Sequence, residues 1–472
     1  MRNLSFQFAG TALLSAALLA SLTPAAHPQQ SAPDPAVDPA LLAPRSDQIP
    51  QNSSLASPPT APKQKKKPAH KDRELLLAAF TIPVAPLGFA PPAVHYLTHH
   101  VTQMSLDFFD EDHILFTFRV PGLIPRPIVG GQRPEYQRHI RAVVVQLSTG
   151  QTQAEDIWTL HDYERYLWML NDGRFLLRDR NLLLVGDASL RLKPFLRFPG
   201  QIDTIELDPL DQFLVADTEE SPSTPVNTTP VKRPTLLAHN GPDSDREDDP
   251  PPLQYLVRIL SMQTRRVVLF SHTNGVVHLP IGSDGYYQVE RADGLNWVVS
   301  HDDLQGNATP YWKIGSVCVP PLDTMAPGFL LASPCADDGS RSLVMLSLPQ
   351  KRILWHTSIP ATSVWPVLAR AANGRRFARA TLELNQPIGT SNPLDPDDIR
   401  TQKLELFDVA DGNMTFVVDA DPPLDAGGNF ALSPSGQRFA VLRQGAIQVF
   451  QLPAPPPLPG VNPSPASPSS LH

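Results

Sequence analysis

Charged residues are scarce in this chain. Asp, Glu, Lys and Arg make up 18% of its 472 residues, and the formal net charge is −8. A protein that binds nucleic acid places a basic face against the phosphates. Because the chain is mildly acidic and has no such face, we predict no nucleic-acid partner.

The familiar signatures of catalytic sites are also missing. The chain contains no Gly-x-Ser-x-Gly elbow, no His-Glu-x-x-His zinc motif and no Gly-x-x-x-x-Gly-Lys phosphate loop. The sialidase box Ser-x-Asp-x-Gly-x-x-Trp is absent too, because "GSDGYYQVE" places its Ser and Asp side by side. We therefore assign no catalytic residue and predict no cofactor.

Long apolar runs are absent after the first residues of the chain. Arg2 precedes an apolar stretch from about Ala9 to Leu22, and the small residues Ala25 and Ala26 follow it. This order is typical of a secretory signal peptide, which we place at residues 1–26. An uncleaved N-terminal anchor is the alternative. We expect a periplasmic or secreted protein without a transmembrane span after cleavage.

Cysteine is nearly absent, with only Cys318 and Cys335. If the chain folds back near Ala326 and Pro327, counting outward places the two cysteines opposite each other. Facing residues of an antiparallel pair have Cα atoms about 4.5–5.5 Å apart, which suits a disulfide. We predict a disulfide, and two buried free thiols remain the alternative.

Proline, in contrast, is abundant, with 53 residues against a usual share of about 5%. Many prolines gather at residues 27–74, a stretch that ends with the basic run "KQKKKPAHKDR", and at residues 453–472. We expect a disordered tether and a disordered tail there. A further disordered insertion is expected at about 217–252, which leaves 75–452 as the folded domain.

The folded part repeats one pattern of short strands and tight turns. Asp-Gly, Asn-Gly and Ser-Gly provide the positive φ that hairpin turns need, and polar turns of this kind recur in "LNDGR", "PLDQF", "GSDGY", "AANGRR" and "SPSGQRF". Each is followed by a second hairpin whose strands alternate apolar and polar residues, which indicates one buried and one exposed side. Units begin near Val101, Tyr163, Gln201, Val276, Ser316, Thr362 and Asn429.

Repeated four-stranded units of about 40–45 residues are typical of a β-propeller. We predict an all-β chain of seven four-stranded blades, although the blurred repeat between 276 and 340 leaves six or eight open. The last unit, "FALSPSGQRFAVLRQGAIQVFQL", has only three strands. An open ring would expose a strand edge. The fourth strand should therefore come from the N-terminal side, from "ELLLAAFTIPVA" or "AVHYLTHHV".

The stretch "LSPSGQRFAVL" resembles the WD40-like and TolB-like propeller repeats, whose first hairpin often reads Ser-Pro-Asp-Gly and a basic residue. Ser435 replaces the acidic residue here. "SLPQKRILW" and "STGQTQAEDIW" look similar to turns of quinoprotein-type blades. The resemblance covers about 95–452 as a repeat pattern. It implies an architecture that binding scaffolds, lectins and enzymes share, and not a function.

Two clusters of possible metal ligands were weighed. His95 and His99 lie four residues apart on one side of a helix or strand, with His100 beside them and Asp107 or Asp110 as a further ligand. Zinc needs three or four such ligands converging, which spacing alone does not provide. The five carboxylates of "DSDREDD" lack the glycine and the distal ligand of a calcium loop. We predict no metal.

Two functions follow as hypotheses. The first is a binding or scaffolding protein of the bacterial envelope, with an envelope protein or a polysaccharide as partner. The second is a propeller hydrolase or lyase acting on a lactone or a glycan. The second requires at least two acidic residues and a histidine or metal converging at the central channel. The six tryptophans are expected between neighbouring sheets, and the oligomeric state cannot be inferred.

Overall fold

The computed structural model describes residues 76–125, 136–161, 164–220, 254–273, 275–387 and 394–460. The predicted signal peptide, the tether, the "DSDREDD" loop and residues 461–472 of the tail lie outside these ranges. The described residues belong to one compact unit, Arg73–His472. Residues 217–220 of the expected insertion belong to the strand Phe213–Glu220, and residues 221–252 lie outside the described ranges.

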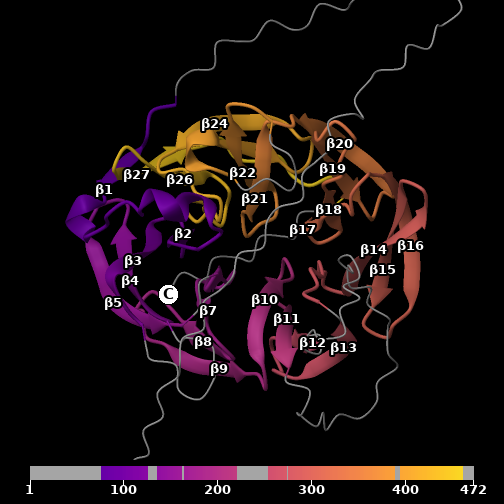
Figure 1. Cartoon of the computed structure of the whole chain (residues 1–472), viewed down its shortest axis with the longest axis horizontal. Helices are drawn as coiled ribbons and strands as arrows, with labels where there is room; N and C mark the ends of the chain where they lie inside the picture. The colour runs from indigo at the N-terminus through magenta and orange to yellow at the C-terminus, as the bar shows by residue number, and fades with distance from the viewer. Residues whose placement is uncertain are drawn as a thin grey trace, which may run out of the picture. The chain divides into compact units, whose positions relative to one another are not determined.

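Seven small antiparallel sheets surround a central axis, which is the ring of a seven-bladed β-propeller (Figure 1). The first blade contains β2 (Met104–Phe108), β3 (His113–Pro125), β4 (Tyr136–Gln146) and β5 (Thr152–Leu160). The second contains β6 (Leu167–Met169), β7 (Phe175–Asp179), β8 (Leu182–Gly186) and β9 (Lys193–Arg197). The third contains β10 (Gln201–Leu207), β11 (Phe213–Glu220), β12 (Gln254–Ser261) and β13 (Val267–Thr273).

The remaining blades follow in chain order. The fourth contains β14 (Gly285–Asp293), β15 (Asn296–Asp303) and β16 (Ala308–Gly315). The fifth contains β17 (Leu322–Ala326), β18 (Phe329–Ala332), β19 (Arg341–Ser347) and β20 (Arg352–Ile359). The sixth contains β21 (Ser363–Arg370), β22 (Arg376–Leu384), β23 (Ile399–Asp408) and β24 (Met414–Ala420). The seventh contains β25 (Phe430–Leu432), β26 (Arg438–Arg443), β27 (Ala446–Gln451) and β1 (Phe80–Pro83).

The first turns of the second, sixth and seventh blades have the expected glycine chemistry, whereas Asp211 takes the positive φ in the third blade, and Gly285 of "GSDGY" begins β14 without a positive φ. Gly173, Gly374 and Gly436 have φ of 76°, 66° and 69°. Each donates its N–H to the carbonyl three residues earlier, at 3.2, 2.9 and 2.8 Å respectively. A side chain at these positions would be strained by the left-handed backbone. The glycines of the repeat therefore set the hairpin that joins the inner strand to the next one.

The N-terminal strand closes the ring, as predicted. β1 pairs with β27 in antiparallel register, with Phe80 opposite Val449 and Pro83 opposite Ala446. Ile82 is buried in a cluster with apolar residues of the first and seventh blades. Of the two candidate runs, the earlier one forms the strand. The later one forms the 3-10 helix η2 (Val94–Thr98), after η1 (Ala85–Leu87).

The fourth blade departs from the four-stranded prediction, because its described part has three named strands. Residues 276–281 take the inner position, and one bridge, Ile281 to Tyr286, connects them to β14. The N–H groups of Val277 and Leu279 are bound by carboxylates of the third blade, at 2.8 and 3.0 Å. Pro280 has no N–H to offer. The N–H groups of Val277 and Leu279 therefore form no ladder hydrogen bonds with β14.

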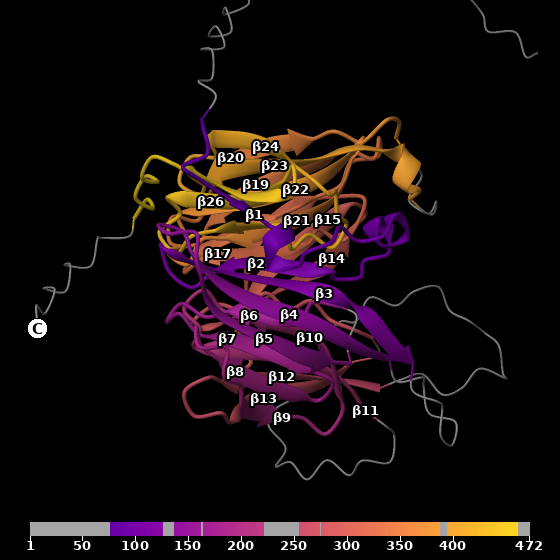
Figure 2. The ribbon, with the colours of Figure 1, turned by 90° about the vertical axis from the view of Figure 1, so that its left-hand side faces the viewer.

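The longest interruptions within blades all follow the second strand of a blade. Within the blades, the three longest connections between successive strands follow β3, β11 and β22, and each joins the second strand of a blade to the third. All inner strands run in the same direction, so the C-terminal ends of β3, β11 and β22 share a face, which we call the loop face. The 3-10 helix η3 (Pro396–Asp398) lies on the same side as η2 (Figure 2). The opposite turn face has the tight hairpins.

Apolar side chains pack between neighbouring blades. Trp158 is buried against Phe175 of the next blade, with ring centroids 5.4 Å apart. Trp355 stacks in the same way on Phe377, at 6.2 Å. These two tryptophans lie where the sequence predicted them, between the sheets. Among the described residues, no helix is long and apolar enough to cross a membrane.

Candidate functional site

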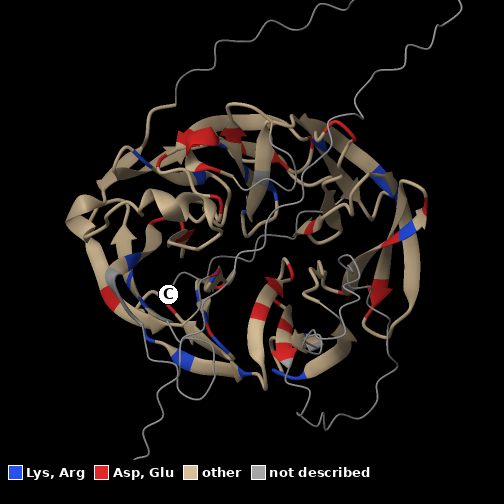
Figure 3. Ribbon diagram, in the orientation of Figure 1, with Lys and Arg blue, Asp and Glu red and all other residues tan. Residues whose placement is uncertain are grey.

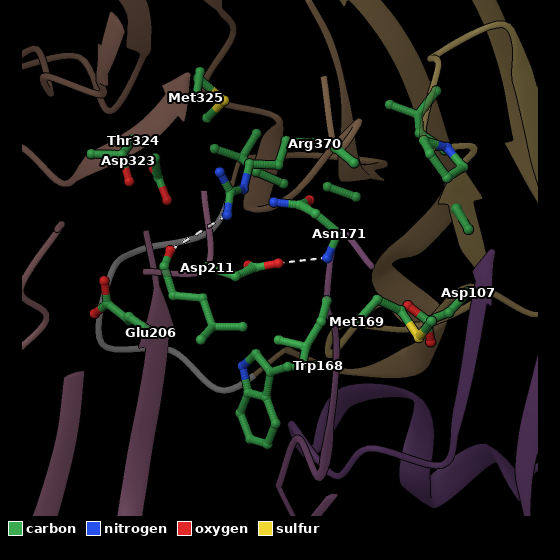
Figure 4. A pocket seen from close by; sticks show the side chains of 18 of the residues that line it. Asp107, Trp168, Met169, Asn171, Glu206, Asp211, Asp323, Thr324, Met325 and Arg370 are labelled. Carbon is green, nitrogen blue, oxygen red and sulfur yellow. Dashed lines mark hydrogen bonds between the residues drawn. The ribbon is translucent and has the colours of Figure 1, made fainter. Parts of the chain in front are cut away.

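A cavity of about 310 Å³ lies in the central channel, and every blade contributes to its wall. The inner strands end here, close to the turn face, so the side chains near their C-terminal ends converge (Figure 4). The ionisable residues that line the cavity are Asp107, Arg165, Glu206, Asp211, His278, Asp323 and Arg370. Acidic and basic segments are visible on the inner strands around the axis (Figure 3).

Alternation along the inner strands explains these charges. Leu106 and Phe108 are buried between sheets, whereas Asp107 lies between them in sequence and points to the other side, toward the channel. Ile205 and Glu206 follow the same rule, as do Leu322 and Asp323. Successive side chains of a strand point to opposite faces. The channel side of each inner strand is thus free to be polar.

Glu206 and His278 form the closest ion pair of the cavity. The Nδ1 atom of His278 lies 2.5 Å from Oε1 of Glu206, and its Nε2 atom lies 2.9 Å from the carbonyl oxygen of Leu322. Both neighbours accept hydrogen bonds and donate none, so both ring nitrogens have to carry a proton. Burial disfavours the imidazolium, but Glu206 and Asp323 outweigh it and raise the pKa of His278 to about 9.

Two other carboxyl groups are difficult to ionise. Burial raises the pKa of Asp323 to about 6, against the opposing effects of His278 and Arg370. Burial also raises the pKa of Asp211 to about 6, although the N–H of Asn171 donates to its Oδ2 atom at 2.5 Å. Burial raises the pKa of Asp107 as well. The cavity therefore holds carboxyl groups whose charge is only partly balanced by the protein.

Two arginines enter the same cavity from different blades. Arg370 of the sixth blade donates from Nη2 to the carbonyl oxygens of Leu207 and Asp208, at 3.4 and 3.2 Å. Arg165, ahead of the second blade, donates from Nε to the carbonyl of Leu167 at 3.1 Å. Its guanidinium lies 5.2 Å from the centre of the Trp168 ring. Both guanidinium groups are thereby held in place at the wall.

The histidines singled out from the sequence lie elsewhere. The rings of His95 and His99 are in contact, with centroids 3.9 Å apart, so they do share a side. The N–H of His100 donates to Asp425 at 2.7 Å. Asp107 lines the channel, and Asp110 is bound to His113 at 2.9 Å. No group of three or more metal-ligating side chains forms in the described part of the chain.

Cys318 and Cys335 are joined by a disulfide, with Cα atoms 5.6 Å apart. The chain folds back between β17 and β18, close to the expected position, and Leu322 faces Ala332 across the hairpin. The bond connects the segment before β17 with the segment after β18. The disulfide therefore fixes the segment that leads into the fifth blade. This segment lies next to residues 276–281 of the irregular fourth blade, because both segments line one small cavity.

The channel residues Glu206, Asp211, His278, Asp323 and Arg370 were missed by the sequence reasoning. Their signal is faint: a single ionisable residue inside or just after an apolar inner strand, as in "TIELDPLDQF", "LDTMA" and "VLARAANG". Each of these segments precedes or contains the first turn of its blade. A comparison of the repeats at that position points to Glu206, Asp323 and Arg370, whereas His278 lies in the irregular fourth blade and gives no such signal.

No family model matches this chain, and no curated protein matches it significantly. Solved structures do resemble it. A chain of the mitotic checkpoint complex has 8% identity and a TM-score of 0.39, covering 85% of this chain and 99% of that one. The propeller domain of the trilobed protease from Pyrococcus furiosus has 10% identity and a TM-score of 0.40, covering 75% and 93%.

Acylaminoacyl peptidase from Pyrococcus horikoshii, without ligand, is 12% identical with a TM-score of 0.42. The match covers 76% of this chain and 53% of the peptidase, so this chain corresponds to about half of that enzyme. At such identities a resemblance concerns the fold alone. The chain is a seven-bladed β-propeller, and its function has to be argued from its own channel.

Proposed function

We propose that this protein is an exported binding protein of the bacterial envelope that holds its ligand at the central channel. The observation that supports this most is the cavity itself, where six blades contribute ionisable side chains to one wall. A propeller positions such groups on a stiff frame. Binding sites that need little reorganisation lose less free energy on association. The ligand belongs to an envelope protein or a polysaccharide.

Export is part of the proposal and depends on the first 26 residues of the sequence. The apolar run behind Arg2 and the small residues after it favour a cleaved signal peptide. A disulfide between Cys318 and Cys335 agrees with an oxidising compartment such as the periplasm. Both observations favour a periplasmic or secreted protein.

A hydrolase or lyase is the second candidate, because its requirement is met in part. Glu206, His278 and Asp323 come together at the channel, which is the combination of two acids and a histidine that such an enzyme needs. Yet His278 is protonated at both nitrogens near neutral pH, so it has no lone pair with which to accept a proton. This arrangement favours binding over base catalysis.

The test is retention of an envelope component by the immobilised protein. The wild-type protein and the double variant Asp323→Asn, Arg370→Gln are incubated with the envelope fraction of the source organism. Retained proteins and sugars are then identified. We expect one or a few components on the wild type and loss of at least about 90% of them on the variant, since removing a charge from a bound pair costs about 2–5 kcal/mol.

The control is the double variant Asp419→Asn, Arg352→Gln, whose exposed residues lie on the outer strands β24 and β20. It should retain the same components as the wild type. Equal retention by all three proteins would show that the channel is not the binding site. Turnover of a lactone or glycan panel by the wild type, and not by Asp323→Asn, would favour the enzyme.

A further inference from the structure

We propose that the channel cavity binds a small zwitterion, a group that carries both an ammonium and a carboxylate. This inference rests on the proposed function, because it assigns a ligand class to the same cavity. It follows from two sets of side chains around one space: carboxylates with unused acceptor atoms and arginines with unused donors.

The acceptors come from the third and fifth blades. Asp323 receives no hydrogen bond from any described residue, although it lines the cavity. Glu206 uses Oε1 for His278 and for the N–H of Leu279, and no described group donates to Oε2. In Figure 4 the side chains of Asp323 and Glu206 lie on the same side of the cavity. An ammonium group with three N–H donors suits such a pair.

The donors come from the second and sixth blades. Arg370 uses only Nη2 for protein carbonyls, and Arg165 uses only Nε. The other N–H groups of both side chains find no acceptor among the described residues. Burial lowers the pKa of Arg370, and repulsion from Arg165 lowers it further, against the attraction of Asp211, Asp208 and Asp323. A carboxylate can bind an arginine through two parallel hydrogen bonds and would relieve this repulsion.

A ligand of one charge sign would serve only half of the wall. Binding buries the groups that face the cavity, and a charged group that is buried without a partner is strongly unfavourable. An amine would leave the remaining N–H groups of the two guanidinium groups without an acceptor, although Asp107 and Asp211 attract these cations. A simple carboxylate would leave Asp323 and the Oε2 atom of Glu206 without a donor, although Glu206 is paired with His278 through Oε1. The zwitterion pairs both sets at once.

The size of the cavity limits the ligand. Its volume of about 310 Å³ is at the lower end of the usual range for ligand pockets, about 300–1,000 Å³. One amino-acid-sized group fits this space, and Met325, Leu368 and Met169 provide an apolar part of the wall for a side chain. The group is either a free amino acid or the same chemistry displayed at the end of a larger envelope molecule.

The experiment measures binding of defined probes to the mature wild-type protein. The standard amino acids are first screened by thermal shift, and the strongest is titrated by calorimetry. Its methyl ester, which lacks the carboxylate, and its N-acetyl derivative, which lacks the ammonium, are then titrated alongside glucose. We expect each derivative to bind at least about tenfold more weakly than the parent, and glucose not to bind. Binding of glucose or equal binding of a derivative would overturn the proposal.

Variants place the two ends of the ligand. Asp323→Asn should weaken binding of the parent amino acid and leave binding of its N-acetyl derivative unchanged. Arg370→Gln should weaken binding of the parent amino acid and leave binding of its methyl ester unchanged. Asp419→Asn and Arg352→Gln are the matched controls on outer strands, and all four variants should melt cooperatively. No binding of any amino acid to the folded wild type would also overturn the inference.

Competition distinguishes the two sources of the group and separates this inference from the proposed function. If the free amino acid displaces the envelope component from the immobilised protein, the group is displayed on that component; if not, the free molecule is the ligand. If the envelope component is retained through the channel but no amino acid binds, the zwitterion is wrong and the binding function stands. If amino acids bind but no envelope component depends on the channel, the zwitterion site stands and the binding of an envelope component is wrong.

Discussion

At the scale of single residues, the cavity is organised around His278. Its imidazolium lies between Glu206 and the carbonyl of Leu322, and the next residue donates its backbone N–H to the same Glu206. Glu206 thus binds the side chain of His278 and the backbone N–H of Leu279, both in the irregular fourth blade. Since His278 connects the inner segment of the fourth blade to Glu206 and to the carbonyl of Leu322, its protonation affects stability.

The stability of the protein should fall as the pH rises from 6.5 to about 9. The pKa of His278 is raised from 6.5 to about 9 in the folded state, so the folded protein binds a proton that the unfolded chain has already lost. Its contribution is complete below pH 6.5 and disappears as the pH passes 9. The raised carboxyl pKa values, about 6 for Asp203, Asp211, Asp217 and Asp323, act at lower pH.

The melting temperature of the wild type and of His278→Gln, measured across this range, tests the assignment. The variant should be less stable at pH 6.5 and should lose much less stability than the wild type by pH 9. His272→Gln, an exposed position on the outer strand β13, is the control and should follow the wild type. If the melting temperature of His278→Gln falls with pH as steeply as that of the wild type, another group causes the pH dependence.

At the scale of elements, alternation and turn glycines explain most strands, and β1 shows how little is needed. It has four residues, of which Ile82 alone is buried. Its side chain packs with Val449 and Ile447 of β27 and with apolar residues of the first blade. A strand of this length depends on that one anchor and on its backbone ladder.

Ile82→Ala should therefore lower the free energy of unfolding by about 2–5 kcal/mol, as expected for a buried isoleucine that leaves a cavity. Thr81→Ala, at an exposed position of the same strand, should change it by less than about 0.5 kcal/mol. Urea unfolding measures both. Similar small effects for the two variants would mean that β1 contributes little to closure.

At the scale of the whole molecule, the seventh blade combines both ends of the folded region. β27 and β1 are antiparallel neighbours, with Ala79 donating to the carbonyl of Val449 at 2.8 Å. The end of β27 and the start of β1 are consequently close enough for a short loop to join them. The ends of such a ring are held by ladder hydrogen bonds in addition to apolar packing between blades.

Two circular permutants would measure that contribution. In the first, a short loop joins β27 to β1 and the chain is opened between Ala188 and Ser189, so that β6–β8 and β9 come from opposite ends and again share one blade. In the second, the chain is opened between Pro199 and Gly200, at a boundary between blades. We expect both to fold, and the second to unfold at a lower urea concentration and to be cleaved faster by protease.

The reason is that no strand ladder crosses the opening of the second permutant, where the blades are held by side-chain packing and by isolated hydrogen bonds such as that from the N–H of Ile202 to the carbonyl of Arg180, at 3.0 Å. Equal urea midpoints for the two permutants would indicate that packing between blades is sufficient. Intrinsic tryptophan fluorescence is a suitable signal, because Trp158 and Trp355 are packed against rings of neighbouring blades.

Local patterns were enough to predict the ring. Period-two alternation and glycine turns depend on neighbours within a few residues, so the starts of seven blades and closure by an N-terminal strand could be predicted from the sequence, which left six or eight blades and two candidate runs for that strand open. The fourth blade was the exception: its inner segment fails as a strand because Glu206 and Asp217, far away in the sequence, bind its N–H groups. No local pattern contains that information.

The candidate site was decided only by the tertiary structure. Glu206, His278, Asp323 and Arg370 belong to four different repeats, and each looks like an ordinary polar residue in its own strand. They meet because the inner strands of a propeller run side by side around one axis, which places equivalent positions of distant repeats in one cavity. Short-range order specifies the blades, whereas the charges that face each other, and their pKa values, depend on closure of the ring.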